Sequence, residues 1–141
     1  MSTLLIVYHS QSGASASLAR AAAEGAAREE GVTVAVRRAC DAGIADLASA
    51  DGLLLVAAEN SGSLSGGAKE FLDRVFYPAI DRGLLLPYAL VISAGNDGRG
   101  ACSQVERILR GIPFKPVADA QICRGEVTQA HLDTACETGL A

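Results

Sequence analysis

Five short apolar runs along the chain are separated by longer stretches in which apolar residues recur every three or four positions. Short runs bounded by glycine or polar residues are typical of buried strands, and the longer spacing is typical of helices that bury one face. The predicted strands cover residues 3–8, 32–36, 53–57, 87–93 and 117–123, and the predicted helices cover 15–30, 68–81, 101–110 and 126–137, with a loop and a short helix at 40–50. This alternation predicts an α/β fold with helices on both faces of a parallel sheet.

The composition of each run indicates where its strand lies in the sheet. The runs around Leu4, Leu53 and Leu90 are apolar on both faces, so they suit central strands. The runs around Val32 and Val117 alternate with polar residues, so they suit the edges. The strand order 2-1-3-4-5, numbered along the chain, satisfies both conditions. Ligands of such sheets bind at the carboxyl ends of the strands where the order reverses, which here is between strands 1 and 3.

A loop rich in hydroxyl groups follows the first strand and opens the first helix. It reads Ser10-Gln11-Ser12-Gly13-Ala14-Ser15 and contains no lysine or arginine. The unpaired N–H groups of a helix start favour an anion, and serine hydroxyls add hydrogen bonds to it. A plain turn with a serine N-cap needs one hydroxyl, and here three surround a glycine. The loop is therefore interpreted as a phosphate site with neutral donors.

Two further polar loops follow the third and fourth predicted strands. The second loop covers residues 59–66 and leads into Lys69-Glu70-Phe71-Leu72-Asp73-Arg74, and the third covers 94–98. Because the carboxyl ends of parallel strands meet at one edge of a sheet, all three loops are expected to lie together there.

The first loop, S-x-S-G-x-S, resembles the phosphate loop of the flavodoxin superfamily. The sequence A-E-N-S-G-S-L-S-G at 58–66, followed by K-E-F-L-D-R, resembles the loop and helix of NAD(P)H-dependent flavin and quinone reductases of flavodoxin type. The resemblance covers about residues 3–114 and implies a flavodoxin-like three-layer sandwich with a five-stranded parallel sheet that binds FMN. It assigns the phosphate to Ser10, Gln11, Ser12, Gly13, Ala14 and Ser15, and the ring to Glu59, Asn60, Ser61, Gly62, Ser63, Ala94, Gly95, Asn96 and Asp97.

The three loops contain no aromatic residue. Classical electron-transfer flavodoxins sandwich the flavin ring between aromatic side chains, whereas an open ring face suits a nicotinamide that stacks on it. The resemblance therefore favours hydride transfer from NAD(P)H to FMN and onward to a small acceptor such as a quinone, with no catalytic acid, base or nucleophile from the protein. Related reductases complete their sites at a dimer interface, which implies a homodimer. An electron-transfer flavodoxin without its own NAD(P)H activity and a non-catalytic flavin-binding module remain alternatives.

Composition excludes several other classes of protein. The length of 141 residues favours a single domain, 1–141. The net charge of −4 and the lack of a basic stripe argue against a nucleic-acid partner, and the apolar runs are too short for a membrane span. The four cysteines lack C-x-x-C spacing and no signal peptide is visible, which favours free thiols in the cytoplasm. Two histidines without ligand spacing predict no metal site.

The sequence also argues against the motifs of other families that bind nucleotides or phosphate. The stretch 62–69 is close to a P-loop, but its lysine is one residue too far from the glycine, and Glu70 stands where a hydroxyl should bind magnesium. The first loop lacks the G-x-G-x-x-G of a dinucleotide site and the cysteine of a small tyrosine phosphatase. The third strand ends in Ala57-Ala58, without the aspartate of a receiver domain.

A few residues near the loops have open roles. Asp97 either contacts the flavin edge or the nicotinamide ribose, or caps a turn with Gly98. Cys102 is predicted at the start of a helix, where the pKa of a thiol falls. The charged positions of the helix at 68–81 are expected to form a solvated face: Lys69, Glu70, Asp73 and Arg74.

Overall fold

The computed structural model describes residues 2–11 and 13–125. Its strands are β1 (Ser2–Tyr8), β2 (Val32–Arg38), β3 (Gly52–Asn60), β4 (Ser63–Leu64), β5 (Pro87–Ala94), β6 (Lys115–Pro116) and β7 (Gln121–Arg124). Its helices are α1 (Ala14–Ala27), α2 (Ile44–Ala48), α3 (Gly66–Asp81) and α4 (Arg99–Gly111). Apart from the short β4 and the pair β6 and β7, strands and helices alternate along the chain as the sequence predicts. The helix predicted at 126–137 lies outside the described residues.

The sheet has the order β2-β1-β3-β5, with β6 and β7 paired in turn along the outer edge of β5. All these pairs are parallel, and the short β4 pairs antiparallel with the end of β3. In the centre of the sheet Ile6 lies between Val36 and Leu54, and Leu55 lies beside Leu90. The predicted order 2-1-3-4-5 and the flavodoxin-like α/β fold class are confirmed.

The fifth strand differs from its prediction at 117–123. Pro116 pairs with Tyr88 and Gln121 pairs with Val91, so the two residues of β5 between them face the four residues 117–120. Two extra residues cannot be accommodated in a regular ladder, so the strand divides into β6 and β7. The prediction was wrong for residues 117–120, because alternation shows a half-buried pattern but not how many residues the neighbouring strand offers.

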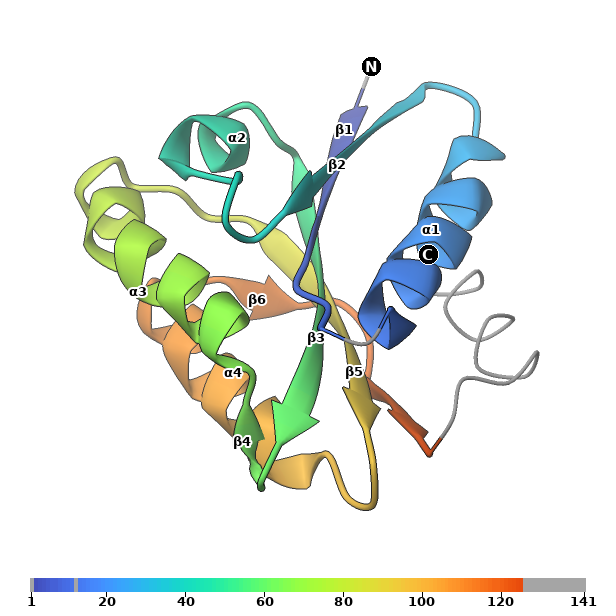
Figure 1. Cartoon of the computed structure of the whole chain (residues 1–141). Coiled ribbons are helices and arrows are strands. Elements are labelled where there is room, and N and C mark those ends of the chain that lie inside the picture. The colour runs from blue at the N-terminus through green and yellow to red at the C-terminus, as the bar shows by residue number, and fades with distance from the viewer. Residues whose placement is uncertain (1, 12, 126–141) are drawn as a thin grey trace.

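Two layers of helices cover the two faces of the sheet (Figure 1). On one face α1 buries Leu18, Ala19 and Ala22 against sheet residues that include Ile6 and Val56. The small alanine side chains let the helix lie close to the sheet. On the other face α3 and α4 bury larger side chains, among them Phe71, Leu72, Val75, Val105 and Leu109. The predicted inward residues Phe76 and Ile108 are half-buried.

The ends of β1, β3 and β5 lie at the same edge of the sheet, and the loops after them converge there (Figure 1). Within the described ranges, no helix is long and apolar enough to cross a membrane. The fold thus gathers the three polar loops at one edge, as predicted.

Candidate functional site

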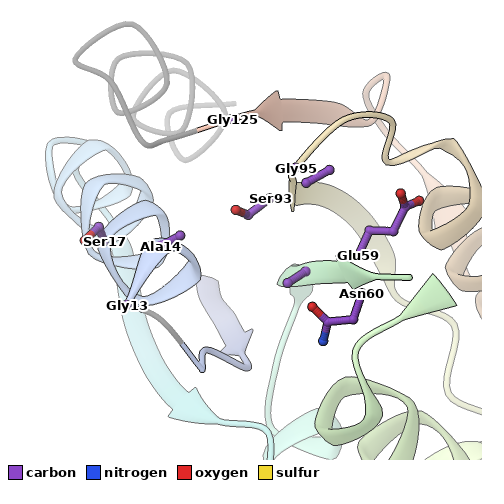
Figure 2. Close-up of a pocket in the computed structure, with 10 residues that line it drawn as sticks. Gly13, Ala14, Ser17, Glu59, Asn60, Ser93, Gly95 and Gly125 are labelled. Atoms are coloured by element: carbon purple, nitrogen blue, oxygen red, sulfur yellow. The ribbon is translucent and has the colours of Figure 1, made fainter. Parts of the chain in front are cut away.

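A cavity of about 730 Å³ lies at this edge of the sheet, between the start of α1 and the ends of β3 and β5 (Figure 2). Residues from all three loops and from the end of β7 line it: Gly13, Ala14, Ser17, Ala58, Glu59, Asn60, Ser93, Ala94, Gly95 and Gly125. A second cavity of about 430 Å³ is lined by Glu59, Ser61, Gly62, Gly95, Asn96, Asp97 and Gly100. Because Glu59 and Gly95 line both, the two cavities adjoin at these residues.

The first loop turns sharply into α1 at Gly13. This residue has a φ of 97°, a conformation that glycine adopts without a steric penalty, and its carbonyl accepts a hydrogen bond from the Ser17 N–H. The hydroxyl oxygen of Ser10 accepts a hydrogen bond from the Gly13 N–H at 2.9 Å, which closes the loop. Ser12 lies outside the described residues.

Ser15 lies in the first turn of α1 and is buried, with 1% of its surface exposed. Its hydroxyl has no hydrogen-bond partner among the described residues. A buried hydroxyl without a partner costs about 1–3 kcal/mol. A bound group with an acceptor atom next to this helix turn would recover that cost.

The second loop is a β-hairpin, which the sequence did not predict. Asn60 pairs with Ser63 across a two-residue turn, in which Ser61 and Gly62 have φ values of 51° and 79°. Two central residues in the left-handed region make the type I′ turn, which matches the twist of paired strands. The Asn60 amide donates a hydrogen bond to the Gln11 side chain at 3.3 Å, so the hairpin also touches the first loop.

The third loop ends at Gly98, which has a φ of 97° and precedes α4. Both oxygens of the Glu59 carboxylate bind here: Oε1 accepts from the Gly98 N–H at 2.9 Å and Oε2 accepts from the Ala101 N–H at 3.1 Å. The Glu59 side chain therefore caps α4.

The side chain of Asp97 binds Arg99, the first residue of α4. Its carboxylate accepts hydrogen bonds from the backbone N–H and the guanidinium of Arg99. The guanidinium bond is the main cause that lowers the pKa of Asp97 below its usual range. The structure thus has Asp97 capping the turn next to Gly98, one of its two predicted roles, and the residue also lines the second cavity.

Among the residues that the structure describes, no lysine, arginine or histidine lines the first cavity. Of the predicted residues that the structure describes, most line one or both cavities, and four line neither: Ser10, Gln11, Ser15 and Ser63. Ser17, Ala58, Ser93 and Gly125 line the first cavity and were not predicted. Ser93 had a detectable signal, because it is the polar residue that ends an apolar strand, and Ser17 lies one turn beyond Gly13 on the same helix.

Cys102 corrects a sequence prediction. It lies in the first turns of α4, as expected, but it is only 8% exposed. Burial raises the pKa of its thiol to about 11, with smaller contributions from the nearby carboxylates of Glu106 and Glu59. The prediction of a lowered pKa was wrong, because desolvation of the thiolate outweighs the helix start.

The charged residues of α3 form exposed ion pairs along one helix face, as expected. Lys69 pairs with Asp73 and Arg74 with Glu70, each four residues apart. The Arg74 guanidinium also donates to the carbonyls of Ala39 and Ala42. These contacts join α3 to the segment after β2.

Among the described residues, no group of three or more His, Cys, Asp or Glu side chains is arranged to hold a metal ion.

Comparison with known proteins places the fold. Solved structures that share it include a flavodoxin from the domain Archaea (TM-score 0.86, 18% identity over 98% of this chain and 94% of that chain), the flavodoxin WrbA-like protein from Agrobacterium tumefaciens (0.83, 20%, 99% and 94%) and oxidised Flavodoxin 1 from Bacillus cereus (0.81, 18%, 98% and 95%). No curated protein sequence matches significantly. The profile of the flavodoxin family matches residues 6–137. The chain therefore belongs to the flavodoxin family, whose cofactor is FMN.

Proposed function

We propose that the chain is a single FMN-binding domain that takes a hydride from NADH or NADPH and passes electrons to a small acceptor such as a quinone. Electron transfer through a bound flavin follows from the family. The nicotinamide and the quinone are the additional steps of the proposal, and the open flavin-ring site supports them.

The first loop fits the phosphate of FMN. The space around Gly13 is open toward the described part of the chain, since a Cβ built there would meet none of its atoms within 4 Å. Ser15 offers a buried hydroxyl without a partner, and α1 offers the N–H groups of its first turn. A phosphate at this position would be held by neutral donors. We assign it to residues 10–15 and expect the hydroxyl of Ser15 to donate to a phosphate oxygen.

The flavin ring is assigned to the hairpin and the third loop. FMN supplies the redox chemistry when bound, and the protein supplies binding and geometry. Asn60 and Ser61 to Ser63 offer backbone groups on one side, and Ala94 to Asp97 offer them on the other. Ser17 and Ser93 line the cavity between these loops and α1, and we assign the ribityl chain to this space.

The observation that carries the reductase proposal is the lack of aromatic side chains among the described residues that line the cavities. Within the described part of the chain, the residues that line the two cavities include no Phe, Tyr or Trp. A ring held there keeps a face open for a nicotinamide, which must stack on the flavin for hydride transfer. A second candidate is an electron-transfer flavodoxin that receives its electrons from a partner protein, and the family match favours it.

The two candidates are distinguished by reduction without a partner. The protein is loaded with FMN, freed of excess flavin and mixed anaerobically with NADH or with NADPH, while the flavin absorbance at about 450 nm is followed. Bleaching much faster than that of free FMN at the same concentration supports the reductase. A bound flavin that stays oxidised but is bleached by dithionite refutes the reductase and supports the electron carrier. Failure to bind FMN at all refutes both.

A further inference from the structure

We propose that Glu59 is a positioning residue, which sets the spacing between the two loops assigned to the flavin ring by clamping the hairpin onto α4. This inference rests on the proposed function, because it takes residues 59–63 and 94–97 as the ring site. The resemblance assigned Glu59 to the ring itself. The contacts of its side chain indicate another role.

The carboxylate of Glu59 spans the start of α4. It accepts one hydrogen bond from the Gly98 N–H, at the last residue of the third loop, and one from the Ala101 N–H, in the first turn of the helix. Both oxygens are thus used by the neighbouring segment. Figure 2 shows Glu59 and Asn60 extending to opposite sides of β3, with Glu59 on the side of the Gly95 loop.

Two more contacts hold the same elements together. The Leu64 N–H of β4 donates to the Gln104 side chain of α4 at 2.6 Å. Gly100 lies directly against the Gly62 carbonyl, since a Cβ built on Gly100 would clash with that oxygen. The hairpin therefore packs closely on the first turns of α4, in addition to its pairing with β3.

This clamp has a consequence for the flavin site. Asn96 and Asp97 immediately precede Gly98, so their position follows the start of α4. A carboxylate that binds Gly98 and Ala101 therefore fixes the third loop relative to the hairpin that carries Glu59. The negative charge is also favourable at a helix N-terminus. Without the clamp, the two loops must be ordered when the ring binds, which weakens binding.

The test uses Glu59→Gln with Glu29→Gln as the matched control. Glutamine keeps the length of the side chain but leaves one acceptor oxygen in place of two. Glu29 is exposed just beyond α1, so its replacement removes the same charge without touching the clamp. Gln104→Ala removes the hydrogen bond from the Leu64 N–H and so loosens the packing of the hairpin on α4 independently of Glu59. This variant replaces Glu59→Gln if Glu59→Gln does not fold.

Three measurements are made: amide hydrogen exchange of Gly98 and Ala101 in the apoprotein, dissociation constants for FMN and riboflavin, and the reduction potential of bound FMN. Glu59→Gln is expected to speed hydrogen exchange at both amides by about tenfold or more. It should also raise the dissociation constants of FMN and riboflavin by the same factor, roughly five to ten. The potential should become less negative, because the variant lacks a negative charge at a residue that lines both cavities. Glu29→Gln should change none of these quantities.

Unchanged exchange at Gly98 and Ala101 in Glu59→Gln would show that the clamp does not hold α4, and would overturn the inference. So would normal binding of riboflavin and FMN with an unchanged potential, because the clamp would then not position the ring site. If the wild-type protein binds neither flavin, the proposed function fails and the ring-positioning role fails with it, while the exchange data separately decide whether the clamp exists.

Discussion

Replacing Ser15 by alanine is expected to stabilise the protein without flavin and to weaken its binding of FMN. The substitution removes one hydroxyl and leaves a methyl group of similar size at a position that is 1% exposed. In the apoprotein this hydroxyl has no hydrogen-bond partner among the described residues. The same hydroxyl is assigned to the FMN phosphate, so one change should have two effects of opposite sign.

The expected magnitudes follow from the cost of an unpaired buried hydroxyl. Its removal should raise the free energy of unfolding of the apoprotein by about 1–2 kcal/mol, and the helix propensity of alanine adds a few tenths more. For a chain of this size about 1 kcal/mol corresponds to roughly 3 °C in Tm. Loss of a hydrogen bond to a charged phosphate costs about 1.5–3 kcal/mol, which is a rise of roughly 10- to 150-fold in the Kd of FMN.

The assay combines thermal unfolding of the apoprotein with titrations of FMN and riboflavin. Riboflavin lacks the phosphate, so its Kd should stay within about twofold of the wild-type value. Ser10→Ala is the matched comparison, because the Ser10 hydroxyl accepts the Gly13 N–H and its loss should lower the Tm of the apoprotein. A lower apoprotein Tm in Ser15→Ala together with unchanged FMN binding would refute both the orphaned hydroxyl and its role at the phosphate.

Three further predictions concern stability. Gly98→Ala should lower the free energy of unfolding in urea by about 2–4 kcal/mol, because φ is 97° and the new Cβ would stand 2.5 Å from Ile122. Gly31→Ala is the control: its φ is 79° and no described atom lies within 4 Å, so it should cost only about 1–2 kcal/mol. Equal costs for the two variants would contradict the prediction. Burial raises the pKa of the Cys102 thiol from 9.0 to about 11, so this thiol loses its proton in the unfolded state before it does so in the folded state. The free energy of unfolding should therefore fall between about pH 9 and 11, by roughly 2 kcal/mol more in the wild type than in Cys102→Ala. Identical slopes of unfolding free energy against pH in the two proteins would count against it. Arg74→Ala should cost about 1–3 kcal/mol, because it leaves two carbonyls of the segment after β2 without their donor, and a change in Tm under about 1 °C would argue that the contact contributes nothing.

Much of the fold could be predicted from the sequence, because it depends on local patterns. Strands that are apolar on both faces must lie inside a sheet covered on both sides, which placed the runs at Leu4, Leu53 and Leu90 in the centre. Parallel strands end at one edge, so the three polar loops had to meet there. Gly13, which the sequence places just before the first helix, has the φ of 97° that a sharp turn favours, while the phosphate assigned to this loop stays a prediction.

The details of the site could not be predicted, because they depend on contacts between residues far apart in the sequence. Glu59 reads as a polar residue at a strand end, and only the position of α4 shows that both its oxygens are used. Ser17 and Ser93 line one cavity although 76 positions separate them, since the fold brings α1 against the end of β5. Burial likewise decided the pKa of Cys102, where the local pattern suggested the opposite direction.

The sequence by itself determined the α/β class, the strand order, the edge at which the three polar loops meet and the neutral character of the first loop. Each of these depends on which residues must be buried and on where the chain can turn, and these are properties of short segments. The tertiary structure alone decided the hairpin at β3 and β4, the division of the last strand into β6 and β7, and the clamp from Glu59 to α4. Those features depend on which partner each backbone or carboxylate group meets, and that partner is supplied only when the whole sheet has assembled.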